Sequence, residues 1–377
     1  MNIIIRTLIF CFLLITNQSL LSKTVSFTEQ DIAIANFITQ IRSDLLDDDI
    51  NGSVSFSIVK ENKVILSKSF GPISRKHKIK TTKNTIYRIG SITKSITGFL
   101  LMQMEQKGLL HLDDPIEKHL PEIRQLINYD KYMPITFRHL ASHTSGLERE
   151  PRSRAVNTGS VNGWELKVLE GIKLSSITAE PGAIYRYSNI GYAILGLAIS
   201  RAAEESYINL VEAHIFKPLE MNSTFFIIPE SLKSHLAEGI AGGPTSELNY
   251  TLPNSEHNGR GYRVPNGGLY STSNDLAKFM IACMGYSNII EQKGIKILLE
   301  TQTPSTELRR NYSFGFQLGK YPDMLMVGHG GATPGYSAHF EFEAKNKYGI
   351  VILRNYNFGN TNLDLRSHSL LKKLSKF

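Results

Sequence analysis

Cysteine is nearly absent from this 377-residue sequence, which contains only Cys11 and Cys283. If the N-terminal segment is removed, one thiol remains and no internal disulfide can form, so the hydrophobic core must stabilise the fold. Cys283 lies in an apolar, helix-like stretch with Phe279, Met280 and Met284, without a His or Asn neighbour to recommend it as a nucleophile. We therefore expect a buried, structural cysteine at position 283.

Motifs for metals, cofactors and nucleic acids are also lacking. The sequence has no repeat of fixed period, no His-Glu-x-x-His and no paired cysteines, so it predicts no metal and no other cofactor. The net charge is +8, but the basic residues are scattered and no nucleic-acid-binding motif accompanies them. One basic cluster comprises Arg75, Lys76, His77, Lys78 and Lys80. We interpret it as a solvated loop, which can have at most a loose attraction to an anionic cell-envelope surface. No oligomeric state is indicated.

Long hydrophobic runs are missing too. The apolar stretch from Leu8 to Ile15 is too short to span a bilayer, and Arg6 is the only charged residue up to Ser22. We interpret residues 1–22 as a signal peptide cleaved near Ser19 or Ser22, which predicts an exported, periplasmic or extracellular protein. An uncleaved membrane anchor is the alternative.

Hydrophobic periodicity predicts strands near both ends of the chain and helices between them. Residues 29–46 and 363–374 have helical patterns, helices dominate residues 91–217, and 247–264 has loop composition. Strand patterns occupy residues 54–58, 64–66, 325–327, 337–342 and 348–353. The predicted fold class is α/β (α+β), with a mainly antiparallel sheet built from both chain ends and flanked by helices. We assign residues 23–90 plus 265–377 to this sheet domain and 91–264 to an inserted, mostly helical domain, with the active site in the cleft between them.

A serine followed three residues later by a lysine can form a nucleophile and its base, and this spacing occurs at Ser57/Lys60, Ser91/Lys94 and Ser369/Lys372. Ser57 lies in a strand pattern, where side chains three positions apart point to opposite faces. Ser369 lies well inside the C-terminal helix pattern, where its hydroxyl is placed for solvent or a local backbone bond. Geometry therefore favours Ser91 and Lys94.

Ser91 follows Gly90 and precedes a helical pattern that continues to Gly108. Lys94 then lies on the same helix face one turn later, and the helix start offers backbone N–H groups to developing negative charge. A lysine can accept the serine proton only if burial lowers its pKa, and apolar neighbours on this helix favour burial. The alternative interpretation of Ser91 is a plain helix N-cap.

Two further segments supply partners for such a site. Tyr187 and Asn189 are two residues apart on a loop, so both side chains can face one cleft. We expect a tyrosine beside a cationic Lys94 to have a lowered pKa and to relay protons. The segment His329-Gly330-Gly331-Ala332 follows an apolar strand, and its small residues let a substrate backbone approach. We assign the oxyanion hole to the N–H groups of Ser91 and Ala332, and substrate binding to Asn189, His329, Gly330 and Gly331. A packed tyrosine turn and a strand end with a surface histidine are the alternatives.

In combination, these segments resemble the class C β-lactamase-type family of serine hydrolases, which also includes penicillin-binding DD-peptidases, D-amino-acid amidases and esterases. The family's three motifs correspond here to Ser91-Ile92-Thr93-Lys94, Tyr187-Ser188-Asn189 and His329-Gly330-Gly331, in the same order. The resemblance runs from about residue 30 to 355. It implies a sheet-plus-helical-domain fold, an acyl-enzyme at Ser91, Lys94 and Tyr187 as coupled proton carriers, and no metal.

His329 stands where many family members have a lysine that holds a substrate carboxylate. Because a histidine is mostly neutral at pH 7, we expect ester, amide or peptide substrates to be turned over faster than β-lactams. The rival hypothesis is a non-catalytic module of the same fold that binds cell-wall peptide or a partner protein. A Ser-His-Asp triad using His143 is disfavoured because no Gly-x-Ser-x-Gly elbow is present, so His143 is interpreted as a loop anchor.

Overall fold

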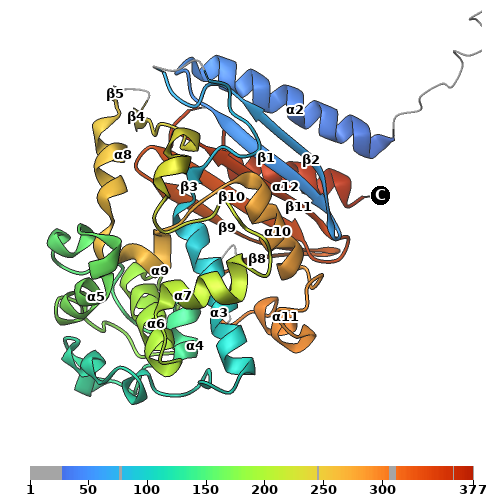
Figure 1. Ribbon diagram of the computed structural model, residues 1–377. Helices are drawn as coiled ribbons and strands as arrows, with labels where there is room; N and C mark the ends of the chain where they lie inside the picture. Colours follow the sequence, from blue (N-terminus) through green and yellow to red (C-terminus); the bar gives the residue numbers. More distant parts are fainter. Residues whose placement is uncertain (1–27, 76–78, 244–245, 305–310, 360, 377) are drawn as a thin grey trace, which may run out of the picture.

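The computed structural model of the protein describes residues 28–75, 79–243, 246–304, 311–359 and 361–376. The expected signal peptide at 1–22, Cys11, and Lys76, His77 and Lys78 of the basic cluster lie outside these residues. Within the described part, a 7-stranded sheet has the order β2-β1-β11-β10-β9-β8-β7 (Figure 1). Its strands are β1 (Val54–Lys60), β2 (Lys63–Phe70), β7 (Asn311–Tyr312), β8 (Gln317–Tyr321), β9 (Met324–Thr333), β10 (Tyr336–Glu343) and β11 (Tyr348–Arg354).

Strands from the N-terminal and C-terminal parts of the chain lie side by side in this sheet, second and third from its β2 edge. β1 pairs antiparallel with β11, in a register that runs from Val54 opposite Arg354 to Lys60 opposite Tyr348. β1 also pairs antiparallel with β2, through a hairpin in which Glu61 adopts a φ of 55°. The predicted strands and the antiparallel sheet built from both chain ends are therefore confirmed.

Helices cover both faces of the sheet. On one face, α2 (Glu29–Asp48) and α12 (Leu363–Leu374) pack together over a cluster that includes Phe37, Phe56 and Leu371. Against the other face lies α10 (Ser273–Cys283), which contacts β1, β2 and β11. Because both faces are covered, β1 is buried along nearly its whole length.

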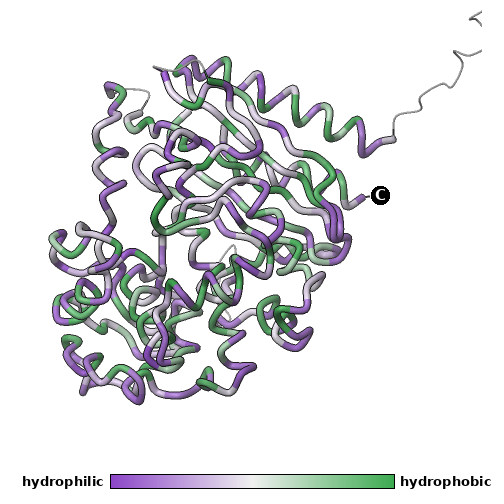
Figure 2. The backbone as a smooth tube through the Cα atoms, viewed as in Figure 1, coloured by the Kyte–Doolittle hydropathy of each residue, from purple (hydrophilic) through white to green (hydrophobic). Residues whose placement is uncertain are grey.

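The helical part of the molecule surrounds α3 (Thr93–Gln106) and α6 (Asn189–Ala202), which lie in the main core. Figure 2 shows hydrophobic residues concentrated along the strands and inner helices, with hydrophilic residues frequent in the outer loops. The other helices are α4 (Phe137–Ala141), α5 (Trp164–Lys173), α7 (Tyr207–Val211), α8 (Thr251–Ser255), α9 (Val264–Gly267) and α11 (Gln292–Leu298).

Short elements replace part of the loop expected at 247–264. This region contains the end of β5 (Ser246–Asn249), α8 and 3₁₀ turns, because its Asn and Ser side chains cap local turns. β5 pairs with β4 (Ala241–Gly243), and β3 (Tyr87–Arg88) pairs with β6 (Tyr270–Ser271) just before the Ser91 segment.

Two expectations about apolar residues can be checked here. Cys283 is buried, as predicted, and burial raises the pKa of its thiol well above the ordinary value. Among the described residues, none of the helices combines the length and hydrophobicity that crossing a bilayer would require.

Candidate active site

Ser91 lies in a one-turn 3₁₀ helix, η1 (Gly90–Ile92), which leads directly into α3. Gly90 adopts a φ of 49°, in the left-handed region, and a Cβ at this position would lie 2.8 Å from the Ala332 nitrogen. A glycine is therefore needed both for the backbone turn and for the close approach of β9. The sequence-based placement of Ser91 at a helix start is confirmed.

Lys94 is fully buried one turn further along and bonds three oxygens. Its Nζ lies 3.1 Å from Ser91 Oγ, 2.8 Å from Asn189 Oδ1 and 2.8 Å from the backbone oxygen of Asn266. The Asn189 amide oxygen and the Asn266 carbonyl can only accept, so they take two N–H groups of the amine. A neutral amine has two N–H groups and one lone pair, and that lone pair is left to face the Ser91 hydroxyl.

The electrostatic surroundings favour this neutral form. Burial lowers the pKa of Lys94 well below its ordinary value, and the positive charge of Arg149 lowers it further. Glu150 opposes these effects and raises the pKa of Lys94. The predicted burial of Lys94, on which its role as a base depends, is thus present in the structure.

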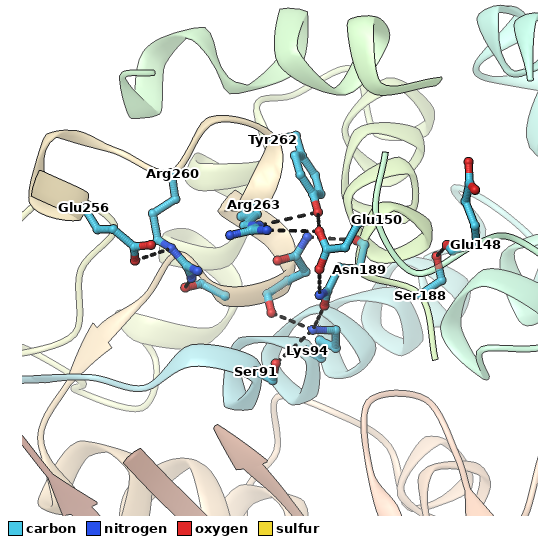
Figure 3. A network of polar contacts seen from close by, with 12 residues as sticks. Ser91, Lys94, Glu148, Glu150, Ser188, Asn189, Glu256, Arg260, Tyr262 and Arg263 are labelled. Carbon is cyan, nitrogen blue, oxygen red and sulfur yellow. Dashed lines mark hydrogen bonds and ion pairs between the residues drawn. The ribbon is translucent and has the colours of Figure 1, made fainter. Parts of the chain in front are cut away.

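A network of polar contacts fixes the orientation of the Asn189 amide, whose oxygen binds Lys94 (Figure 3). Asn189 Nδ2 donates to Glu150 Oε1 at 2.5 Å, and the carboxylate also accepts from the Tyr262 hydroxyl and from Arg263 at 3.1 Å. Because Glu150 can only accept, the Asn189 amide must turn its oxygen toward Lys94. Burial raises the pKa of Glu150, but the Tyr262 hydrogen bond and the Arg263 charge together hold it below its ordinary value.

Tyr187 lies beside Lys94, whose Nζ is 4.8 Å from the centre of the Tyr187 ring. Burial raises the pKa of Tyr187 well above its ordinary value, against the smaller lowering effect of a hydrogen bond with Ser91. The expectation of a lowered pKa is therefore wrong, because it assumed a cationic lysine and ignored desolvation. A further difference is that Asn189 begins α6 instead of lying on a loop, with Ser188 as N-cap.

His143 holds the Tyr187 segment in place. Its Nδ1 accepts a hydrogen bond from the Ser188 backbone N–H at 3.0 Å, its carbonyl accepts from the Arg186 N–H at 2.7 Å, and its ring packs 4.2 Å from the Tyr187 ring, centroid to centroid. His143 is fully buried and its pKa is depressed well below normal by burial. The interpretation of His143 as a loop anchor is confirmed.

His329 is 2% exposed, so it is not a surface histidine. Its Nε2 bonds the Tyr312 hydroxyl at 2.9 Å, and its Nδ1 lies 2.6 Å from the Gly330 oxygen. Burial is the main cause that lowers the pKa of His329 to about 3. His329 is thus neutral at pH 7, as its ordinary pKa also led us to expect, and it offers no positive charge to a substrate carboxylate.

The predicted oxyanion-hole residues lie together at the edge of β9. A Cβ on Gly331 would lie 2.0 Å from the Ile89 oxygen and 3.3 Å from the Ser91 nitrogen, so β9 packs directly against η1. Beyond Gly328, β9 still pairs with β10 but no longer pairs with β8. The edge of β9 that β8 leaves unpaired there faces the cleft. The backbone N–H groups of Ser91 and Ala332 therefore come from two adjoining segments.

A cleft of about 650 Å³ opens over these residues. The predicted residues on its wall are Ser91, Tyr187, His329, Gly330, Gly331 and Ala332. Asn189 and Lys94 do not line the cleft; Lys94 reaches it through its contact with Ser91, and Asn189 through its hydrogen bond to Lys94. Arg149 also lines the cleft, is exposed, and stacks 4.9 Å from the Tyr187 ring centre, so it brings a positive charge that neutral His329 does not.

The sequence reasoning missed Arg149, Glu150, Tyr262, Arg263 and Asn266. The adjacent charges Arg149-Glu150 within the 143–162 loop were the available signal for the first two. Asn266 directly precedes Gly267-Gly268, a segment that resembles the family pattern, but nothing in the sequence indicates that its carbonyl would reach Lys94.

Comparison with known proteins gives a consistent result. The sequence profile of the family described as Beta-lactamase matches residues 42–374. Protein flp of Staphylococcus aureus (strain MW2) is 29% identical over 85% of this chain and 62% of its own length. Beta-lactamase-like protein 4 of Dictyostelium discoideum is 30% identical over 66% of this chain and 44% of its own length. The chain therefore spans less than two thirds of the length of each of these two relatives.

Solved structures share the fold at lower identity. The octameric penicillin-binding protein homologue from Pyrococcus abyssi superposes with a TM-score of 0.77 at 23% identity, over 91% of this chain and 77% of that one. A class C beta-lactamase gives a TM-score of 0.75 at 18% identity, over 93% and 98% of the two chains. The profile match covers most of the chain, and we conclude that this protein belongs to the beta-lactamase family.

Proposed function

We propose that this protein is a serine hydrolase that forms an acyl-enzyme on Ser91, with Lys94 as the base. The observation that carries the proposal is the buried Lys94 amine, 3.1 Å from Ser91 Oγ, with its two other contacts made to oxygens that only accept. A purely structural lysine has no need of a depressed pKa, whereas a base does.

In the proposed reaction, Ser91 Oγ attacks the substrate carbonyl carbon as its proton moves to the Lys94 lone pair. The carbonyl oxygen becomes an oxyanion bound by the N–H groups of Ser91 and Ala332. Tyr187 then passes the proton from Lys94 to the leaving group as the oxyanion collapses and the bond to the leaving group breaks, which leaves the acyl group on Ser91 Oγ. Water then attacks the acyl-enzyme and gives its proton to the same pair, which returns a proton to Ser91 Oγ as the acyl–Oγ bond breaks and the acid is released.

The neutral His329 supports substrates that need no fixed anion at the third motif, such as esters, amides or peptides. In contrast, β-lactams and peptides ending in D-Ala carry a carboxylate that the family's lysine would bind. We therefore expect a short-chain nitrophenyl ester or a D-amino-acid amide to be hydrolysed with higher kcat/KM than a chromogenic cephalosporin. Cephalosporin turnover faster than ester turnover would contradict this substrate assignment.

Covalent labelling tests the enzyme proposal directly. A fluorophosphonate probe should add one label to Ser91, detected by mass spectrometry of the peptide, while the Ser91→Ala protein stays unlabelled. Ser57→Ala is a matched control, since Ser57 also begins a Ser-x-x-Lys sequence but lies in β1, hydrogen-bonded to Ser67 and Ser273 at 3.0 Å. A wild-type protein that takes no label and hydrolyses no ester favours the non-catalytic binding module.

We also propose that the protein is exported, on the basis of the composition of residues 1–22. N-terminal sequencing of protein from the cell envelope or medium should find a start near residue 20 or 23. An intact Met1 in an envelope-bound protein would instead favour the uncleaved anchor.

A further inference from the structure

Four side chains with metal-binding atoms converge between β10 and α12. His339 and Glu341 are two residues apart on β10 and so lie on the same face of the sheet, the face that α12 covers. Asp364 and His368 are four residues apart on α12 and so lie on the same side of the helix, one turn apart. The strand and helix periodicities thus bring two imidazoles and two carboxylates together.

The distances are too long for hydrogen bonds. His339 Nε2 lies 3.8 Å from Glu341 Oε2 and 3.6 Å from Asp364 Oδ1, and His368 Nδ1 lies 3.8 Å from Glu341 Oε2. One ligand atom from each of His339, Glu341 and Asp364 lies within 4.8 Å of the other two. Hydrogen bonds of this kind span about 2.7–3.2 Å, so these atoms lie close together without hydrogen bonds to one another.

Several of these atoms are buried without a partner. His339 and Glu341 are each 3% exposed, and within the described residues His339 Nε2, Glu341 Oε2 and His368 Nδ1 have no hydrogen bond. Buried polar atoms are normally satisfied, so a cluster of neighbouring unsatisfied atoms needs an explanation. A bound cation would also satisfy the buried Glu341 carboxylate oxygen.

We propose that His339, Glu341 and Asp364 bind a divalent transition-metal ion, Zn²⁺ by their chemistry, with His368 as the nearest further ligand. Tetrahedral zinc with bonds of about 2.0–2.2 Å holds its ligand atoms about 3.3–3.5 Å apart. The spacings of 3.8 Å and 3.6 Å from His339 Nε2 to Glu341 and Asp364 are close to this geometry, and the two carboxylates, whose ligand atoms lie within 4.8 Å of each other, would move together on binding. Imidazole and carboxylate ligands suit zinc, whereas Ca²⁺ and Mg²⁺ take oxygen ligands.

The proposed site lies close behind the candidate active site. His339 is opposite Gly330 in the β9–β10 register, and a Cβ on Gly330 would have His339 Nδ1 as its nearest neighbour, at 3.9 Å. His339 and Asp364 also line the same cleft as Ser91. The ion would fasten α12 to β10 at the rear of this cleft. The proposal departs from the sequence-based expectation of no metal, which searched for contiguous motifs, whereas these ligands come from two separate elements.

Metal binding by the purified full chain, without a histidine tag, tests the proposal. After treatment with EDTA and dialysis, ZnCl₂ titrated by calorimetry should bind one ion per chain and raise the Tm. His339→Asn and Glu341→Gln should each weaken zinc affinity at least tenfold and remove most of the Tm increase. Mg²⁺ or Ca²⁺ should produce no comparable increase in the Tm.

Controls keep the result interpretable. His111 is exposed, 69% in its side chain, so His111→Asn should bind zinc like the wild type. If a buried variant fails to fold, Asp364→Asn provides a second test, because the Asp364 side chain is 39% exposed in the first turn of α12. Absence of zinc binding by the wild type, or affinity that survives in all three ligand variants, would overturn the proposal.

Discussion

Replacing Glu150 by glutamine should allow Lys94 to act as the base for Ser91 at lower pH. Hydrolysis requires neutral Lys94, so the rate rises with pH through the Lys94 pKa and gives an acid limb. Glu150 raises that pKa because its carboxylate stabilises the ammonium form. Without this charge the ammonium is less stable, the pKa falls, and the acid limb moves to lower pH.

The size of the shift follows from the geometry. Lys94 Nζ and Glu150 are joined through Asn189 by hydrogen bonds of 2.8 Å and 2.5 Å. At a separation of about 6–7 Å and an effective dielectric constant of about 20, Coulomb's law gives roughly 2.5 kcal/mol, or nearly two pKa units. The Glu150 side chain is 34% exposed, so solvent and salt reduce the interaction. We expect an acid-limb shift of about one pH unit.

The assay is the pH dependence of kcat/KM for a nitrophenyl ester, measured for both proteins at constant ionic strength. The substituted amide oxygen can still accept from Asn189, and the amide nitrogen no longer accepts from Arg263. The Arg263 charge lowers the Lys94 pKa, so its loss of a carboxylate partner acts in the same direction as the loss of the Glu150 charge. Glu148→Gln is the matched control: the Glu148 carboxylate accepts from Ser176 at 2.8 Å and stands apart from the Lys94 network in Figure 3, so its acid limb should not move. An unchanged limb, or a shift to higher pH, in the Glu150→Gln protein would refute the reasoning.

Three further outcomes follow from the site. Gly331→Ala places a Cβ 2.0 Å from the Ile89 oxygen and should push β9 off η1, lowering kcat by about 10²–10³-fold. In Gly330→Ala the atom nearest to the new Cβ is 3.9 Å away, so the Tm of this variant, measured by thermal unfolding, should stay within about 2 °C of the wild-type value. Lys94→Met should slow fluorophosphonate labelling by about 10²–10⁴-fold at pH 7, and an unchanged labelling rate would remove Lys94 as the base. The His329 pKa of about 3 lies below the unfolded value of 6.5, so the unfolded state binds the extra proton and stability falls as the pH drops from 6.5 toward 3. Urea unfolding at pH 7 and pH 4 should show His329→Gln losing less stability than wild type, by up to about 3 kcal/mol, and equal losses would contradict the assignment.

Local patterns predicted the frame of the molecule and the nucleophile. Period-two alternation around Phe56 and the apolar strand near Ile350 predicted β1 and β11, because a strand's two faces are set by its own residues. Ser91 and Lys94 were chosen among three candidate pairs by helix and strand geometry, which is likewise local. The structure agrees on the two strands and on the helix start at Ser91, and the role of Ser91 as nucleophile stays a prediction.

Properties that depend on long-range packing were harder to predict. Glu150 reaches Asn189 across 39 residues and Tyr262 across 112, and no periodicity carries such pairings. The pKa of Tyr187 was predicted in the wrong direction because its value depends on how deeply the tertiary fold buries the ring. The His339 and Glu341 cluster likewise became visible only when α12 was placed on β10.

The pKa values of Lys94 and Tyr187 together define the resting state of the proposed site. Burial lowers the pKa of the amine and raises that of the phenol, so it disfavours an ammonium–tyrosinate pair on both counts. Two uncharged groups remain: an amine with a lone pair directed at Ser91, and a phenol that still holds its proton. A tyrosinate is therefore not available as the first base, and the phenol's part is to pass a proton onward after Lys94 has taken one. With this order of transfer, the Lys94 pKa sets the acid limb of the pH–rate profile. The charge of Glu150 can therefore shift that limb by shifting the Lys94 pKa.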